Sequence, residues 1–97
     1  MTIYAVQYTY DSRDALRDEV RPEHRDYFRS LADAGSLLGS GPYSEGAPGA
    51  LLILRAPDDA ALDALLAADP FHREGLISQS VVRPWNLVIG PWASTAD

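Results

Sequence analysis

The amino-acid sequence predicts one α+β domain with elements in the order β-α-β-β-α-β. Two amphipathic stretches with apolar residues at three- and four-residue spacing alternate with segments rich in strand-forming residues. The 97 residues suffice for a single domain, residues 1–97, and not for two. The simplest fold with this order is a four-stranded antiparallel sheet with both helices on one face, the ferredoxin-like arrangement.

The first half of the chain predicts a strand, a helix and a second strand. Residues 2–10 are rich in β-branched and aromatic side chains, which favours a strand. Residues 15–21 are charged and fit either a helical turn or a mobile loop. Pro22 suits the first turn of a helix, because its missing N–H group costs nothing there, and this helix is expected to end at Gly35. Residues 36–43 predict the second strand, which runs into a loop.

The next segment predicts a buried strand followed by the second helix. Residues 50–56 are apolar without strict alternation, as expected for a strand that is covered on both faces. Asp58 or Asp59 can cap the helix that follows. This helix is expected to end before Pro70, since the residue that precedes a proline disfavours helical geometry.

The end of the chain predicts a turn, the last strand and a tail. Residues 71–75 fit a short turn or a single helical turn, and residues 77–87 predict a strand that is interrupted at Pro84. Residues 88–97 form a C-terminal tail. The apolar and aromatic content is too high for a bare sheet face, so we expect the sheets of two copies to pack together in a homodimer, or in a higher oligomer.

Composition excludes several classes of function. The net charge of −6 argues against sequence-independent binding of nucleic acid, which needs clustered basic residues. The chain has no cysteine, no apolar run long enough for a membrane span and no signal-peptide pattern, so we expect a cytoplasmic protein that does not bind membranes. It has no glycine-rich phosphate loop and no Gly-x-Gly-x-x-Gly motif, so we expect no nucleotide cofactor.

Two residues beside prolines are the best candidates for chemistry. His24 lies in Arg21-Pro22-Glu23-His24, and Asp69 directly precedes Pro70. The spacing of His24 from Phe28 places it on the core stripe of the predicted helix, facing inward. A neutral imidazole held by a carboxylate can transfer protons near neutral pH. The ordinary alternative is structural, because a histidine at a helix start and an aspartate before proline are both common packing and turn residues.

Five segments in order resemble the YCII-related (YciI-like) family of small bacterial proteins, which has the dimeric α/β-barrel form of the ferredoxin-like fold. The resemblance runs from Met1 to about Val88, and the segments that carry it are Tyr4-Ala5-Val6, Arg21-Pro22-Glu23-His24, Gly41-Pro42, Asp69-Pro70-Phe71 with Gly75-Leu76, and Arg83-Pro84-Trp85-Asn86. It implies a His–Asp pair in a pocket as the active site, and the family's two residues map onto His24 and Asp69. One relative in this family is a dechlorinating lyase that acts on a chlorinated hydroxyhydroquinone.

Further residues are candidates for substrate contact, each with a structural alternative. Arg21 can hold a carboxylate or phenolate at the pocket rim or be solvated. Trp85 can stack on a ligand, although core or dimer packing is the more ordinary role. His72 is expected at the surface, and a three-ligand metal site with His24 and Asp69 matches no zinc spacing, so no metal is expected. The remaining candidates for the pocket wall are Ser40, Gly41, Pro42 and Phe71.

The sequence thus gives two expectations for function. The first is a cofactor-free enzyme of the lyase or isomerase type, in which His24 moves a proton on a small organic, possibly aromatic, substrate and Asp69 orients the imidazole. The second is a non-catalytic module for small-molecule binding or dimeric interaction, in which the His24–Asp69 pair is a structural hydrogen bond. A solvent-reachable cleft beside His24 favours the enzyme, and a sealed contact favours the module.

Overall fold

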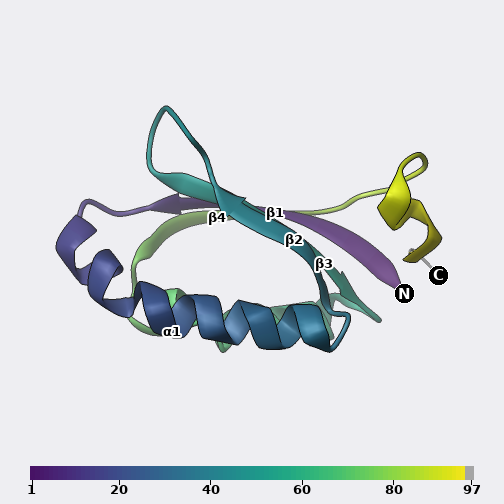
Figure 1. Cartoon of the computed structure of the whole chain (residues 1–97), viewed down its shortest axis with the longest axis horizontal. Helices are drawn as coiled ribbons and strands as arrows, with labels where there is room; N and C mark the ends of the chain where they lie inside the picture. The colour runs from purple at the N-terminus through teal and green to yellow at the C-terminus, as the bar shows by residue number, and fades with distance from the viewer. Residues whose placement is uncertain (96–97) are drawn as a thin grey trace.

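The computed structural model describes residues 1–95 and shows the ferredoxin-like α+β fold, with the α-helices on one face of the sheet (Figure 1). Four antiparallel strands are arranged in the order β2-β3-β1-β4. The elements are β1 (Thr2–Tyr10), α1 (Asp14–Asp33), β2 (Leu37–Pro42), β3 (Gly49–Ala56), α2 (Asp59–Ala67), α3 (Pro70–Arg73), β4 (Ile77–Pro84) and the 3₁₀ helix η1 (Pro91–Thr95).

The first helix is longer than the sequence pattern predicts. It begins at Asp14, eight residues before Pro22, so the charged residues 15–21 are helical and Pro22 lies inside the helix rather than in its first turn. A proline inside a helix costs about 3 kcal/mol. The part of α1 before Pro22 is anchored by Arg17, whose buried guanidinium donates to the backbone oxygen of Asp11 at 2.8 Å and lies 5.0 Å from the ring centre of Tyr10.

The remaining boundaries follow from local chemistry. Asp58 caps α2 by accepting a hydrogen bond from the Ala61 N–H group at 2.8 Å. Gly35 has a φ of 84° directly after the C-cap of α1, a conformation that favours glycine. Residues 71–75 lie largely in the single turn of α3, and the last strand ends at Pro84 on the sheet edge.

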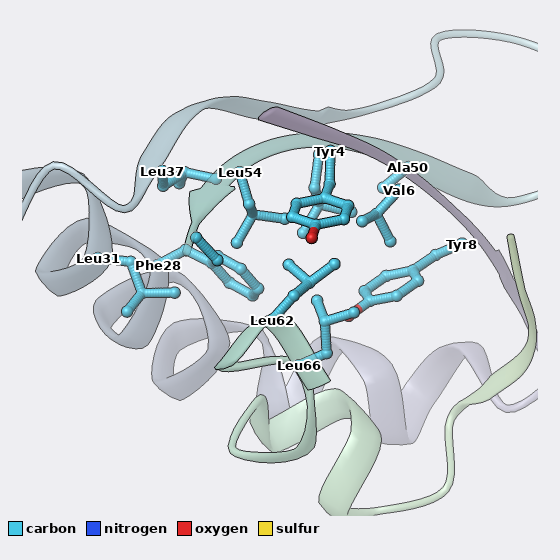
Figure 2. Close-up of a cluster of buried hydrophobic side chains, with 12 residues drawn as sticks. Tyr4, Val6, Tyr8, Phe28, Leu31, Leu37, Ala50, Leu54, Leu62 and Leu66 are labelled. Carbon is cyan, nitrogen blue, oxygen red and sulfur yellow. The ribbon is translucent and has the colours of Figure 1, made fainter. Parts of the chain in front are cut away.

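The core lies between the sheet and the helices (Figure 2). The side chains of Tyr4, Val6 and Tyr8 alternate along β1 and point toward the helical layer. Phe28 from α1 and Leu62 from α2 meet them, and all five side chains are at least 96% buried. His24 lies one helical turn before Phe28, so it reaches the end of this core.

The opposite face of the sheet is partly covered by the C-terminal segment. Gly39 pairs with Ile53 on this face, and a Cβ atom at Gly39 would lie 2.7 Å from Cη2 of Trp92. The glycine in β2 therefore permits the close approach of the indole ring. Leu51 and Val81 remain 37% and 40% exposed on the same face. Of the predicted tail, residues 96–97 lie outside the described part of the chain.

Within residues 1–95, no helix is long and apolar enough to cross a membrane.

Candidate functional site

The structure brings His24 and Asp69 together across 45 positions of sequence. The distance between His24 Nδ1 and Asp69 Oδ1 is 2.7 Å. The carboxylate can only accept, so Nδ1 of a neutral His24 carries the proton and Nε2 holds the free lone pair. The Asp69 side chain is fully buried and His24 is 15% exposed. The imidazole therefore remains reachable by solvent while its carboxylate partner does not.

The local sequence explains the position of Asp69. It is the N-cap of α3, and its Oδ1 atom also accepts a hydrogen bond from the Phe71 N–H group at 2.9 Å. Pro70 at the first helical position fixes the backbone for this turn. Asp69 Oδ1 thus caps the N-terminus of α3 and also accepts the hydrogen bond from the His24 imidazole on α1. The orientation of His24 therefore depends on the formation of α3.

Aromatic rings fix the plane of the His24 imidazole. Phe71 stacks on it with ring centres 3.9 Å apart and an angle of 11°. Phe28 lies 4.8 Å away at 57°, and Tyr10 contacts the edge of Phe71 at 5.4 Å. With the hydrogen bond to Asp69, these contacts leave the ring little rotational freedom, which is the preorganisation that proton transfer requires.

Asp69 also acts on the neighbouring tyrosines. Burial raises the pKa of Tyr8 well above its ordinary value, and the charge of Asp69 raises it further. Burial and Asp69 together raise the pKa of Tyr10 to about 12, although the guanidinium groups of Arg17 and Arg21 oppose the change. Both hydroxyls therefore stay protonated near neutral pH and can donate hydrogen bonds but cannot act as bases.

A cavity of about 590 Å³ opens beside His24. Its volume is within the range typical of small-molecule sites. Helix α1 and strands β2 and β3 form its walls, with Tyr10 and Phe71 beside the imidazole. The lining residues are Tyr10, Arg21, His24, Arg25, Phe28, Arg29, Ala32, Leu37, Ser40, Gly41, Pro42, Ala50, Leu52 and Phe71.

Most of the predicted contact residues lie at this cavity. Those that line it are Arg21, Ser40, Gly41, Pro42 and Phe71. Trp85 does not: it follows β4, its backbone N–H group donates to the backbone oxygen of Ile3 at 2.8 Å, and the residue is 42% exposed. His72 is exposed on α3 and is also absent from the lining. Among the described residues, no group of three or more histidine, aspartate or glutamate side chains is placed to hold a metal ion.

The sequence analysis missed Arg25 and Arg29 as cavity residues. Both follow Arg21 at intervals of four, a spacing that places them on one helical face. The four-residue spacing of the three arginines was not recognised as one helical face, because the helix was expected to begin at Pro22 and Arg21 therefore lay outside it. The corrected length of α1 puts the three arginines on one continuous edge.

The fold and the site define a small ferredoxin-like protein with a His–Asp pair at the wall of a cavity. The YCII-related domain matches residues 2–86, and the chain belongs to this family. No curated protein matches the sequence at a significant level.

Solved structures show the same fold at low sequence identity. One is the 5-chloro-2-hydroxyhydroquinone dehydrochlorinase TftG from Burkholderia phenoliruptrix AC1100 in complex with 2,5-dihydroxybenzoquinone. It has a TM-score of 0.74 and 20% identity, over 86% of this chain and 92% of that one. PA3566 from Pseudomonas aeruginosa has a TM-score of 0.56 and 17% identity, over 88% and 93% of the chains. An antibiotic biosynthesis monooxygenase has a TM-score of 0.55 and 20% identity, over 92% and 100%.

Proposed function

We propose that this protein is a small enzyme of the lyase or isomerase type, which uses His24 and Asp69 to transfer a proton on a small organic substrate without a cofactor. The observation that carries the proposal is the 2.7 Å contact between His24 Nδ1 and Asp69 Oδ1 at the wall of an open cavity. The dehydrochlorinase TftG, bound to a dihydroxybenzoquinone, supports an aromatic or quinone-like substrate.

The geometry favours a definite sequence of proton movements. His24 Nε2 takes a proton from a carbon or hydroxyl group of the substrate, and the resulting imidazolium is stabilised by the Asp69 carboxylate. In an isomerase the proton returns to a different substrate atom. In a lyase the leaving group departs with its bonding electron pair, and the imidazolium then releases its proton to solvent or to that group.

The competing proposal is a binding module in which the pair is structural. The complete burial of Asp69 and its role as the cap of α3 favour it. The position of His24 favours the enzyme instead, because the imidazole lies at a cavity that also contains Gly41 and three aromatic rings. A purely structural hydrogen bond does not require a reachable imidazole.

The decisive experiment compares His24→Asn with His24→Ala. Asparagine can place an amide N–H where Nδ1 lies, so it keeps a donor to Asp69 but provides no base. The assay follows exchange of carbon-bound protons with D₂O by NMR for a panel of small ketones, phenols and hydroquinones. It also follows chloride release from 5-chloro-2-hydroxyhydroquinone. The wild type should turn over at least one compound, and both variants should lose about 10²- to 10⁴-fold in rate.

Retained stability in His24→Asn together with lost turnover supports catalysis. Absence of turnover across the panel, or turnover that His24→Asn leaves unchanged, contradicts the enzyme. Unfolding of His24→Ala with normal stability of His24→Asn would show in addition that the hydrogen bond stabilises the fold.

We further propose that two copies pair through the uncovered part of the sheet. Leu51 and Val81 are large apolar residues left exposed on that face. Pairing would remove them from water, and the apolar area gained would enlarge the small core of a chain of this length.

A further inference from the structure

Three arginines follow one edge of the cavity on successive turns of α1. Arg21, Arg25 and Arg29 are four residues apart, so their side chains lie along one helical face, and all three line the cavity. Among the described residues, no aspartate or glutamate lines it, although the whole chain has a net charge of −6. The cavity therefore has a positive edge in an acidic protein.

Two of these arginines are already neutralised by aspartates. Arg21 is paired with Asp18, and Arg29 is paired with Asp26 at 3.1 Å, each with the residue three positions earlier in the helix. The two aspartates line a smaller hollow of about 270 Å³, which Arg25 and the two paired arginines also line. Neither aspartate lines the larger cavity, whereas the three arginines line both hollows.

Arg25 differs from its neighbours. Pro22 occupies the position three residues before it, where the other two arginines have an aspartate. Within residues 1–95, Arg25 makes no ion pair. The repeated spacing Asp-x-x-Arg, Pro-x-x-Arg, Asp-x-x-Arg therefore leaves one uncompensated guanidinium at the middle of the cavity edge.

The rest of the cavity favours an apolar ligand body. Phe28 and Phe71 provide aromatic walls beside His24, and Leu37 and Leu52 provide aliphatic ones. Such walls bury a ring or a short hydrocarbon skeleton and offer it few hydrogen bonds. A ligand that fills the cavity thus combines an apolar body with one polar end.

We propose that the substrate of this site is a small organic acid, whose carboxylate binds Arg25 while its apolar, ring-sized body lies against the aromatic walls next to His24. The guanidinium fork matches the two oxygens of a carboxylate, whereas a phenolate offers one. A phosphate that used a second guanidinium would compete with Asp18 or Asp26, which are paired with Arg21 and Arg29. This inference rests on the proposed function and names the substrate class of the same site.

The test measures binding of two probes and their neutral counterparts at millimolar concentration. Benzoate and 2-naphthoate are titrated into the ¹⁵N-labelled protein, and benzamide and 2-naphthamide serve as the uncharged matches. At least one carboxylate should bind more tightly than its uncharged counterpart. Its binding should shift the backbone ¹H–¹⁵N signals of α1 and β2. Arg25→Gln should weaken carboxylate binding about five- to tenfold and leave amide binding unchanged. Arg25→Lys, which keeps the charge and loses the fork, should recover part of the loss.

Arg73→Gln is the matched control, because Arg73 is a surface arginine outside the cavity lining, and it should bind the carboxylates as the wild type does. The proposal is overturned if neither carboxylate binds, if carboxylate and amide bind equally, or if Arg25→Gln matches the wild type. Failure here is separate from failure of the proposed function. If neutral compounds show proton exchange that depends on His24 but no carboxylate binds, only the proposal of an acid substrate is rejected. If carboxylates bind through Arg25 but no proton exchange depends on His24, only the proposal that the protein is an enzyme is rejected.

Discussion

Burial and the Asp69 carboxylate together hold the pKa of the Tyr8 hydroxyl above its ordinary value, and both groups lie inside the fold. Among the described residues, neither the Tyr8 hydroxyl nor Asp69 Oδ2 has a hydrogen-bond partner, while Asp69 Oδ1 contacts both His24 and Phe71. The two oxygens of one carboxylate thus have different surroundings. Oδ1 orients His24 and caps α3, while the charge of the whole carboxylate raises the pKa of the neighbouring tyrosines.

The charge of Asp69 should be measurable through the tyrosines. Asp69→Asn removes the charge and leaves burial in place, so the pKa of Tyr10 should fall below about 12 but remain above the ordinary 10.0. Ultraviolet absorption titration follows the phenolates, and Tyr10→Phe identifies the transition that belongs to Tyr10. An unchanged Tyr10 pKa in Asp69→Asn would show that the carboxylate does not act on this ring.

The same pKa shifts predict a loss of stability in alkali. The pKa values of Tyr8 and Tyr10 are raised in the folded protein, so their contribution to stability is complete below pH 10.0 and is lost as the pH rises through the folded pKa. Urea unfolding from about pH 8 to about pH 11, which spans the ordinary tyrosine pKa, should show this decline. Tyr10→Phe should decline less steeply, and an equal decline would contradict the assignment.

Asp69 should contribute to stability through its two accepted hydrogen bonds. Asp69→Ala leaves the His24 Nδ1–H and Phe71 N–H groups without their acceptor and should lower the free energy of unfolding by about 3 kcal/mol. Asp69→Asn keeps an acceptor oxygen and should cost about 1 kcal/mol or less. Urea denaturation gives both values. Equal losses in the two variants would mean that the charge, and not the cap, stabilises α3.

An ion pair between Glu23 and Arg73 links α1 to α3 on the surface. The guanidinium donates to both carboxylate oxygens of Glu23, at 2.6 and 3.0 Å, and holds the pKa of Glu23 below its ordinary value of 4.5. Because the folded pKa is lowered, this stabilisation is present above pH 4.5 and is lost as the pH falls through the folded value. Carboxyl ¹³C titration should show the lowered pKa, and Arg73→Gln should restore it. A Glu23 pKa that Arg73→Gln does not change would contradict the ion pair.

Gly39 should be required for the packing of the C-terminal segment. A side chain at this position collides with the Trp92 ring, so Gly39→Ala and Gly39→Val should displace η1 and shift the Trp92 fluorescence to longer wavelength. Measurement in a Trp85→Phe background isolates Trp92. Gly41→Ala is the control, because a Cβ atom there meets nothing within 4 Å. Unchanged emission in Gly39→Val would show that the ring does not pack on β2.

The proposed dimer should be sensitive to charge on the uncovered sheet face. Val81→Asp places a carboxylate among apolar residues of that face and should shift a wild-type dimer toward monomer. Analytical ultracentrifugation measures the change. Asp63→Lys on the exposed side of α2 is the control and should stay dimeric. A monomeric wild type, or a dimeric Val81→Asp variant, would contradict pairing through this face.

The sequence by itself determined the element order and the composition of the core. Alternation along β1 and the three- and four-residue spacing around Phe28 report local geometry, which depends on neighbouring residues only. Turn chemistry predicted Gly35 as the end of α1 and Asp58 or Asp59 as the cap of α2 for the same reason, and the structure has Asp58 as that cap. Resemblance to the YCII-related family also indicated His24 and Asp69 as a pair.

The tertiary structure alone decided what depends on residues that are far apart in the chain. Helix α1 continues through Pro22, against the local preference of proline to begin a helix, and the buried Arg17 in the part before Pro22 contacts Tyr10. That extension aligns Arg21, Arg25 and Arg29 along the cavity. The contact of His24 with Asp69 spans 45 positions, and no local pattern encodes it, because packing of α1 against α3 sets the distance.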